Sequence, residues 1–292
     1  MRACYSHDYC VPTRLGGLEK LGQVAQEVQR GALAELHNPP VLNTGHLYAL
    51  HDPAYVDAFL QGEGSLAISQ NLPWSQALRG AVLAMQAGQL QAAEMALRDG
   101  ISAHIANGFH HARYARGRGF CTFNGLALVA RAWPARRVFV LDCDDHGGDG
   151  TAEFTTLLDN LFNYSICSSS FDAVTGPRSV IRIDRCDGGA LGTGYRESLE
   201  QAFEVIRSWR PHLLIYQAGV DCHRDDPLGR GQAGTEDLYA RDEQVFRFAR
   251  AQHLPLLFTL AGGYQSRETT VALHRNTFLA ARRAYGMGVN VS

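Results

Sequence analysis

The sequence has almost no lysine. Lys20 is the only one, so the positive charge of this 292-residue chain comes almost entirely from arginine. The 27 basic residues are balanced by 29 acidic ones, which leaves a net charge of −2 at pH 7. Binding to nucleic acid without sequence preference needs an excess of positive charge. We therefore expect no nucleic-acid partner.

Long apolar runs and paired cysteines are missing too. No uninterrupted apolar run approaches the length needed to cross a bilayer, and the N-terminal MRACYSHDYC lacks the apolar core of a secretion signal. The seven cysteines include no Cys-x-x-Cys pair, and Cys143, Cys167 and Cys222 lie in or beside apolar runs. Reduced cysteine packs there as a small hydrophobic residue. We expect a cytoplasmic protein without a membrane partner or a disulfide framework.

The chain also lacks Gly/Ser/Pro-rich linkers and internal repeats, and its 46% hydrophobic content is typical of a globular protein. Short apolar runs alternate with segments of helical periodicity. We predict strands near residue 3 and over residues 101–106, 137–143, 161–167, 179–183, 212–219 and 255–263. We predict helices over residues 18–36, 75–97, 124–133, 194–209, 235–252 and 267–285. This alternation favours a single α/β domain over residues 1–292, built on a parallel sheet with helices on both faces.

Four of the predicted strands end in polar residues that a plain turn does not require. They are followed by His110-His111, by the segment DCDDHGGDG (142–150), by Asp221 and by Tyr264. In open parallel sheets, ligands bind beyond the carboxyl ends of the strands. Four separate segments that deliver acid–base groups to one edge indicate a functional site.

The first candidate is a metal site. Asp142 and Asp144 have the i, i+2 spacing of one strand face, and His146 follows before the chain turns. Asp and Gly are common at strand-to-helix turns, so the Asp-x-Asp pair alone could be only a turn. Together with Asp221 from another strand, Asp144 and His146 make three protein ligands, which is the number that leaves a position for water or substrate.

The second candidate is a set of acid–base groups. Two carboxylates nearly neutralise a divalent ion, so water bound there needs a separate general base. His110 and His111 can supply one, with Asp142 and Asp149 available to orient them. Adjacent histidines are more often a surface feature when they occur alone. Tyr264 follows two glycines and could donate a hydrogen bond to a developing oxyanion, although such a tyrosine is more often packing.

These residues carry a resemblance. The segments GFHHARYARGRGFCTFNGLALVA (108–130), VLDCDDHGGDGTAEF (140–154), QAGVDCHRDDPLG (217–229) and LAGGYQ (260–265) resemble the signature blocks of the zinc-dependent histone deacetylase family, within the arginase–deacetylase superfamily. The compact length is most similar to class IV and its bacterial relatives. The resemblance implies a single α/β domain around a mainly parallel eight-stranded sheet.

The resemblance also implies roles for individual positions. It makes Asp144, His146 and Asp221 the Zn²⁺ ligands, and it makes His110 and His111 the tandem histidines, with Asp142 and Asp149 as their partners. It makes Tyr264 the residue that polarises the acyl carbonyl, Phe120 and Phe171 the walls of the acyl-lysine tunnel, and Asp142 and Ser165 ligands of a monovalent cation such as K⁺. His111 is expected to accept the proton of the attacking water.

Some positions depart from the family pattern. Gly147 stands in place of a second histidine, Gly125 in place of an aspartate, Asn107 in place of a glycine and Cys167 in place of a histidine. None of them is a predicted metal ligand or catalytic group, so the reaction type stands while the analogy of substrate weakens. The expected substrate is an acylated lysine or a small acylated amine. The alternatives are an acetylpolyamine or small N-acyl metabolite amidohydrolase, and a catalytically silent acyl-lysine-binding protein.

Overall fold

One sheet organises the molecule. In this computed structural model, which describes residues 1–13, 17–172, 176–184 and 193–288, the sheet has eight strands in the order β2-β1-β3-β8-β7-β4-β5-β6. Every pair of neighbouring strands is parallel. The strands are β1 (Arg2–Cys4), β2 (Glu35–His37), β3 (Ile101–Asn107), β4 (Val138–Asp142), β5 (Leu161–Cys167), β6 (Ser179–Ile183), β7 (Leu213–Ala218) and β8 (Leu256–Leu260). The predicted parallel sheet is confirmed.

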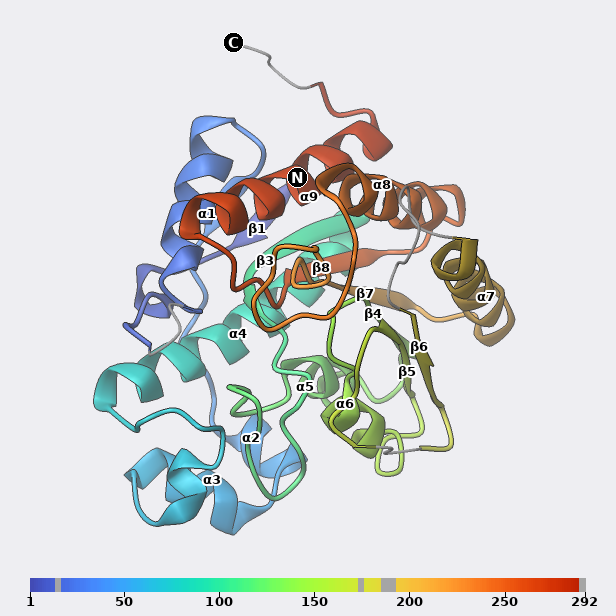
Figure 1. The fold of residues 1–292 in the computed structure, drawn as a ribbon. Helices are drawn as coiled ribbons and strands as arrows, with labels where there is room; N and C mark the ends of the chain where they lie inside the picture. Colours follow the sequence, from blue (N-terminus) through green and yellow to red (C-terminus); the bar gives the residue numbers. More distant parts are fainter. Residues whose placement is uncertain (14–16, 173–175, 185–192, 289–292) are drawn as a thin grey trace.

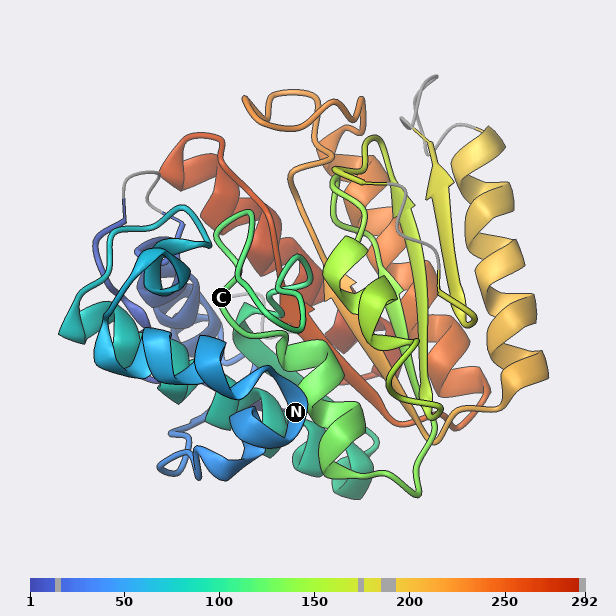
Figure 2. The same ribbon diagram turned by 90° about the horizontal axis from the view of Figure 1, so that it is seen from below.

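Helices cover the sheet in two layers (Figure 1). The first layer contains α1 (Lys20–Arg30), α7 (Thr193–Trp209), α8 (Thr235–Ala251) and α9 (Arg267–Tyr285). The second contains α2 (Gly45–Leu50), α3 (Pro53–Gln61), α4 (Gln76–Asp99), α5 (Gly125–Ala132) and α6 (Asp149–Phe154). Short 3₁₀ turns, η1 (His7–Tyr9) and η2 (Ser65–Ile68), complete the described elements. Figure 2 shows α7 alongside the edge strand β6.

The helix boundaries follow from local chemistry. The long helix α4 begins after Ser75, whose side chain accepts a hydrogen bond from Leu78 N, and it ends at Gly100, whose φ of 85° reverses the chain. Helix α5 begins after Asn124, which accepts from Ala127 N. The central strands β3, β4 and β7 are buried almost throughout, as expected for a parallel sheet covered on both faces.

The predicted helix 18–36 is wrong in its second half. Helix α1 ends at Arg30, because Gly31 follows and Ala32 takes a positive φ of 47°. The chain then forms the short strand β2, which pairs with β1 at the edge of the sheet. The small helices α2, α3 and α6 were not predicted, since each is too short for its periodicity to stand out from the surrounding loops.

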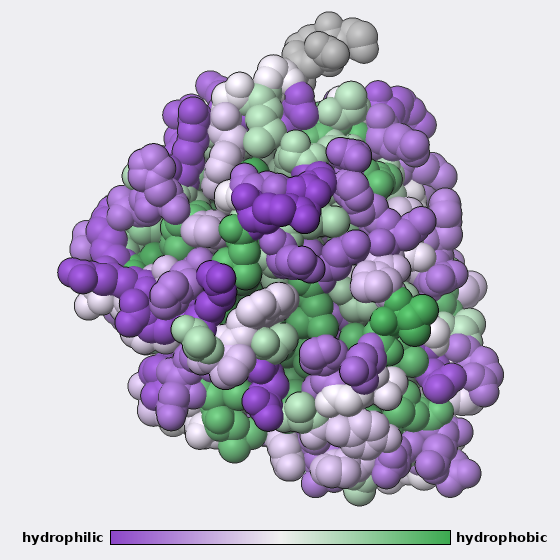
Figure 3. Space-filling view, turned by 180° about the vertical axis from the view of Figure 1, so that it is seen from behind, coloured by the Kyte–Doolittle hydropathy of each residue, from purple (hydrophilic) through white to green (hydrophobic). Residues whose placement is uncertain are grey.

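The surface is that of a globular α/β protein. Polar and apolar residues are interspersed over the face opposite to that of Figure 1 (Figure 3). Within the described ranges, no helix has both the length and the apolar character required to cross a bilayer. The architecture therefore directs attention to one edge of the sheet, where the four central strands end.

Candidate active site

The four strands that end in polar residues are neighbours in the sheet. Strands β3, β8, β7 and β4 are consecutive in the strand order. Because they are parallel, their carboxyl ends lie at the same edge. Residues at or beyond these ends line one cavity of about 40 Å³; Gln217 comes from β7 itself, and His110, His111, His146 and Tyr264 come from the segments after the other strands. The predicted convergence at one sheet edge is therefore present in the structure.

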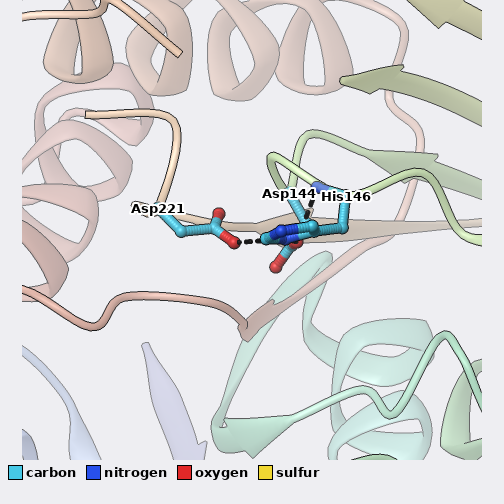
Figure 4. Close-up of side chains that lie close together, drawn as sticks. All are labelled: Asp144, His146 and Asp221. Atoms are coloured by element: carbon cyan, nitrogen blue, oxygen red, sulfur yellow. Dashed lines mark hydrogen bonds and ion pairs between the residues drawn. The ribbon is translucent and has the colours of Figure 1, made fainter. Parts of the chain in front are cut away.

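The side chains of Asp144, His146 and Asp221 point toward one another (Figure 4). The ligand atoms of Asp144, His146 and Asp221 all lie within 4.8 Å of one another, and both carboxylates are buried. His146 Nδ1 is 3.1 Å from Asp221 Oδ2 and 3.5 Å from Asp144 Oδ1. Within the described part of the chain, no other group of three or more His, Cys, Asp or Glu residues meets this criterion.

The surroundings of this cluster fit a metal ion. Two backbone N–H groups orient the carboxylates, since Gly262 N donates to Asp144 Oδ2 over 2.7 Å and Asp145 N donates to Asp221 Oδ1 over 2.9 Å. A side chain at position 262 is excluded, because its Cβ would lie 2.1 Å from Asp221 Oδ2. Burial, together with the charge of Asp144, raises the pKa of Asp221 to about 8. Two buried carboxylates beside an imidazole suit a divalent cation such as Zn²⁺, which takes N and O ligands.

The tandem histidines each have a carboxylate partner. His110 Nδ1 lies 2.7 Å from Asp142 Oδ2, and His111 Nδ1 lies 2.6 Å from Asp149 Oδ1. Phe109, just before the pair, has a φ of 60°, so the chain turns sharply as it leaves β3. These contacts leave Nε2 of each imidazole as the nitrogen that can exchange a proton with a substrate.

The two histidines differ in their protonation. Burial alone would lower the pKa of His110, but Asp142 and Asp144 outweigh it and raise the pKa to about 9. Burial, and then the charge of His110, lower the pKa of His111 to about 4, although Asp149 opposes this shift. The pair therefore holds one cationic and one neutral imidazole, and the rings are 3.9 Å apart between centroids. A divalent cation beside them would lower both pKa values.

Tyr264 is held by its backbone rather than by its ring. Tyr264 N donates to Asp226 Oδ2 over 2.7 Å, and the ring centroid lies 5.6 Å from Lys20 Nζ. Burial, followed by the charges of Asp144 and Asp221, raises the pKa of the phenol well above its usual value. The hydroxyl consequently remains protonated and available as a hydrogen-bond donor at neutral pH.

Of the two phenylalanines of the predicted tunnel, Phe120 lines this cavity, and Phe171 contacts two histidines that line it. The Phe120 ring lies 6.4 Å from the Tyr264 ring. The Phe171 ring lies 4.6 Å from His111 and stacks on His146 at 5.5 Å, while 46% of the residue is exposed. The guanidinium carbon of Arg118 lies over the Phe171 ring, at 5.1 Å from its centroid. The role of the two rings as tunnel walls stays a prediction.

The predicted cation residues are also neighbours. Asp142 and Ser165 are register partners in the β4–β5 pair. Ser165 Oγ accepts a hydrogen bond from Gly148 N over 3.1 Å, and a Cβ at Gly148 would lie 2.5 Å from Asp142 Oδ2. The two side chains therefore face the same turn, and K⁺ binding there stays a prediction.

Two residues of the site were missed by the sequence analysis. Asp145 accepts hydrogen bonds from Ser168 Oγ, Arg230 N and Gly231 N. It therefore connects two loops to the segment that carries Asp144 and His146. Lys20 Nζ donates to Ala261 O over 2.9 Å and to Gly263 O over 3.2 Å, on either side of Gly262. The signals were present, since Asp145 adjoins a predicted ligand and Lys20 is the only lysine. Their contacts are too distant in sequence to be inferred.

Larger hollows lie away from this cavity. One of about 590 Å³ lies between α1 and α9 and is lined by residues such as Gln23 and Arg275. Another of about 590 Å³ is lined by residues 38–43, α4 and Trp133. Neither contains a candidate catalytic or metal-binding residue, so volume alone does not identify the site.

Comparison with known sequences agrees with the geometry. Residues 11–278 match the sequence model of the histone deacetylase domain. The chain is 31% identical over 264 residues to an uncharacterised protein of Picosynechococcus sp., which covers 86% of each protein. It is 33% identical over 196 residues to histone deacetylase 2 of Arabidopsis thaliana, covering 63% of this chain and 49% of that protein. It is 32% identical over 196 residues to an acetylpolyamine amidohydrolase of Burkholderia pseudomallei, covering 59% and 54%.

The fold is also found among solved structures. A crystal structure of acetylpolyamine aminohydrolase from Burkholderia pseudomallei superposes with a TM-score of 0.80, covering 97% of this chain and 99% of that one. The sequences are 18% identical in that superposition, so it establishes the fold alone. The alignments to the two relatives with named activities span about half of each relative's length.

Proposed function

The chain belongs to the histone deacetylase family, and on that premise we propose that it is a zinc-dependent hydrolase that removes an acetyl or other acyl group from an amine, with acyl-lysine as the substrate. The observation that carries the proposal is the meeting of four strand ends around one small cavity. A triad of potential metal ligands, two carboxylate-backed histidines and a tyrosine all line or adjoin it. A protein that only binds an acyl-lysine does not need this full set.

The metal ion would act as a Lewis acid. Asp144, His146 and Asp221 would hold Zn²⁺, which when bound polarises a carbonyl group and lowers the pKa of coordinated water. The remaining chemistry belongs to the residues of the chain. His111, oriented through Nδ1 by Asp149, accepts at Nε2 the proton of the attacking water. A proton from the histidine pair then passes to the nitrogen of the leaving amine.

Tyr264 acts on the carbonyl oxygen of the substrate. Its hydroxyl donates a hydrogen bond to that oxygen as negative charge develops on it. The site excludes water with Phe120 and Phe171, whose rings flank the stem of the acylated side chain. Lys20 and Asp226 fix the loop that carries the tyrosine, so the donor is in place before the substrate enters.

One feature of the entrance favours acyl-lysine over an acylated polyamine. A polyamine carries further ammonium groups, which a free carboxylate at the entrance would recognise. Asp172, next to Phe171, is already paired with Arg113 and Arg118, at 2.5 Å from Arg113. Arg113 also pairs with Asp149 at 2.9 Å. This side of the entrance is therefore better suited to a neutral peptide backbone than to a second cation.

The test compares two substrates and two variants. We expect the full-length protein loaded with Zn²⁺ to release acetate from an acetyl-lysine peptide, to do so faster than from N-acetylputrescine, and to stop when 1,10-phenanthroline removes the metal. Asp221→Asn keeps the size of the side chain but removes a charge, so we expect loss of bound zinc by elemental analysis and loss of activity. Tyr264→Phe should keep the zinc and lose about 10²–10³-fold in kcat.

The outcomes separate the candidate functions. Faster hydrolysis of N-acetylputrescine would assign the chain to the acetylated polyamines. Binding of acetyl-lysine peptide without turnover, in protein shown to hold one zinc, would contradict the proposed hydrolase and identify a binding protein. Unchanged turnover by Tyr264→Phe would remove that residue from its proposed role.

A further inference from the structure

The catalytic cavity contains two carboxamides that the proposed reaction does not use. Asn107, at the end of β3, and Gln217, in β7, both line the cavity together with His110 and Tyr264. Asn107 Oδ1 and Gln217 Oε1 are buried, and neither has a hydrogen-bond partner among the residues that the structure describes. A buried oxygen without a partner is unfavourable, so two of them in one cavity call for a ligand group.

The orientation of Gln217 is fixed from one end. Its Nε2 donates to Asp142 Oδ1 over 3.2 Å, behind His110. Its Oε1 therefore faces away from Asp142, toward the backbone of Gly108, where a Cβ would lie only 2.3 Å from this oxygen. Rotation of the carboxamide would place the oxygen against the carboxylate and lose this hydrogen bond.

Asn107 is displaced from the regular sheet. The pairing of β3 with β8 shifts its register between His104 and Asn107. Within this irregular stretch, the Thr259 side chain compensates for the lost pairing at one carbonyl, since its Oγ1 donates to Ala106 O over 2.6 Å. The side chain of Asn107 makes no such contact. Asn107 as a whole is half-buried and lines the cavity, whereas its Oδ1 is buried.

The wall beside these carboxamides is tightly packed. A Cβ at Gly108 would also meet Leu126 Cδ2 at 2.5 Å, and one at Gly262 would meet Asp221 Oδ2 at 2.1 Å. With a volume of about 40 Å³, the cavity accepts a short acyl group. Any group that enters meets polar atoms as well as the apolar side chains of Phe109 and Cys121.

We infer that Asn107 and Gln217 select short acyl groups with a hydroxyl on the carbon next to the carbonyl, such as glycolyl, over aliphatic acyl groups of the same size. A hydroxyl both donates and accepts, so it can pair with a carboxamide, whereas a methylene or methyl group leaves the buried oxygens without a partner. The inference rests on the proposed function and names the acyl class of that same site.

The experiment uses a matched pair of substrates. Glycolyl-lysine and propionyl-lysine peptides contain the same number of non-hydrogen atoms, so the ratio of their kcat/KM values isolates polarity from size. For the zinc-loaded wild type we expect a glycolyl-to-propionyl ratio of about 10–100. Asn107→Leu keeps the approximate shape of the side chain without its amide and should lower the ratio to about 1 or below. Asn107→Ala serves as a second variant if Asn107→Leu does not fold.

Two controls accompany these variants. Asn38→Leu makes the same chemical change in the hollow lined by residues 38–43, away from the catalytic cavity. It should leave the glycolyl-to-propionyl ratio of kcat/KM unchanged. The second control measures by calorimetry the affinity of both peptides for the Tyr264→Phe variant and for the double variant that also carries Asn107→Leu. This measurement does not depend on turnover. Glycolyl peptide should bind more tightly than propionyl peptide only when Asn107 is present.

The possible failures are distinguishable. Cleavage of acetyl-lysine with a glycolyl-to-propionyl ratio of 1 or less, or a ratio that Asn107→Leu leaves unchanged, overturns the inference while the proposed function stands. Absence of all cleavage in zinc-loaded protein contradicts the proposed function, and the binding preference then decides the inference by itself. Equal binding of the two peptides in that case overturns it as well.

Discussion

His104 and His110 lie on the same segment of chain and are both buried, but their pKa values are shifted in opposite directions. His104, within β3, contacts Gln89 Oε1 at 2.6 Å and the Tyr9 hydroxyl at 3.3 Å, and burial lowers its pKa to about 3. His110, just beyond β3, contacts Asp142 at 2.7 Å, and its pKa is raised to about 9. The carboxylates beside His110 therefore reverse the effect of burial on its pKa. At His111, Asp149 does not, because the charge of His110 adds to the effect of burial.

This difference in pKa corresponds to the positions of the two histidines along and beyond β3. At the middle of β3, helices cover both faces and the polar contacts of His104 are with neutral groups. At the carboxyl end, Asp142, the last residue of β4, and Asp149, the first residue of α6, each contact one imidazole. His51, which is also buried, receives a hydrogen bond from Asn124 N and contacts Arg113 O, and burial lowers its pKa to about 4. Burial therefore lowers the pKa of His51 and His104, whose hydrogen-bond partners are neutral.

The largest effect is expected when the carboxylate partner of His110 is replaced by a neutral one, which makes the surroundings of His110 resemble those of His104. Asp142→Asn preserves the shape of the side chain and removes its charge, so we expect His110 to lose its proton and kcat to fall about 10²–10⁴-fold. The measurement is steady-state kinetics with an acetyl-lysine peptide, beside elemental analysis of zinc. A variant that keeps zinc and full activity would show that the charge of His110 does not matter to the reaction.

A second test concerns the buried cation near Tyr264. Lys20→Met removes the two hydrogen bonds to Ala261 and Gly263 but keeps an unbranched side chain of similar length. We expect kcat to fall about 10–100-fold, because each lost hydrogen bond to a charged group typically costs 1.5–3 kcal/mol and the Tyr264 loop becomes less ordered. KM and zinc content should change little, and Lys20→Arg should restore part of kcat. An equal loss of stability and activity in both variants would indicate a purely structural role.

The smallest expected effect is on the pH dependence of the free energy of unfolding, which tests the lowered pKa of His104. Because the folded-state pKa of His104 is about 3, below the usual value of 6.5, its contribution to stability is present above pH 6.5 and is lost as the pH falls toward 3. The slope reaches about 1.4 kcal/mol per pH unit for one such group. Gln89→Glu gives His104 a carboxylate, raises its folded-state pKa and should reduce this slope. Urea unfolding between pH 7.5 and pH 5 measures it; an unchanged slope would contradict the explanation.

Much of the fold follows from the sequence, because apolar runs and helical periodicity reflect burial directly. The strands of the central sheet and the long helices α4, α8 and α9 were predicted close to their observed bounds. Strand β2 and the end of α1 were not, because the position of Gly31 was outweighed by the apolar residues beyond it. These short edge elements take their structure from pairing and packing rather than from their own pattern.

The candidate site divides in the same way. The rule that parallel strands expose their carboxyl ends together was enough to group Asp144, His146 and Asp221. It gave no information on Lys20, whose hydrogen-bond partners lie 241 and 243 positions further along the chain. The unpaired oxygen of Asn107 also depends on a register shift that no local pattern announces.

The last strand of the sheet occupies a central place, between β3 and β7. As the polypeptide leaves the ribosome, β1, β2 and β3 on one flank, and β4 to β7 on the other, emerge first and present two open edges. Only the arrival of β8 joins them, and it brings the tyrosine loop along with it. Closing contacts of such long sequence separation is slow, so chaperones should be needed most in that interval.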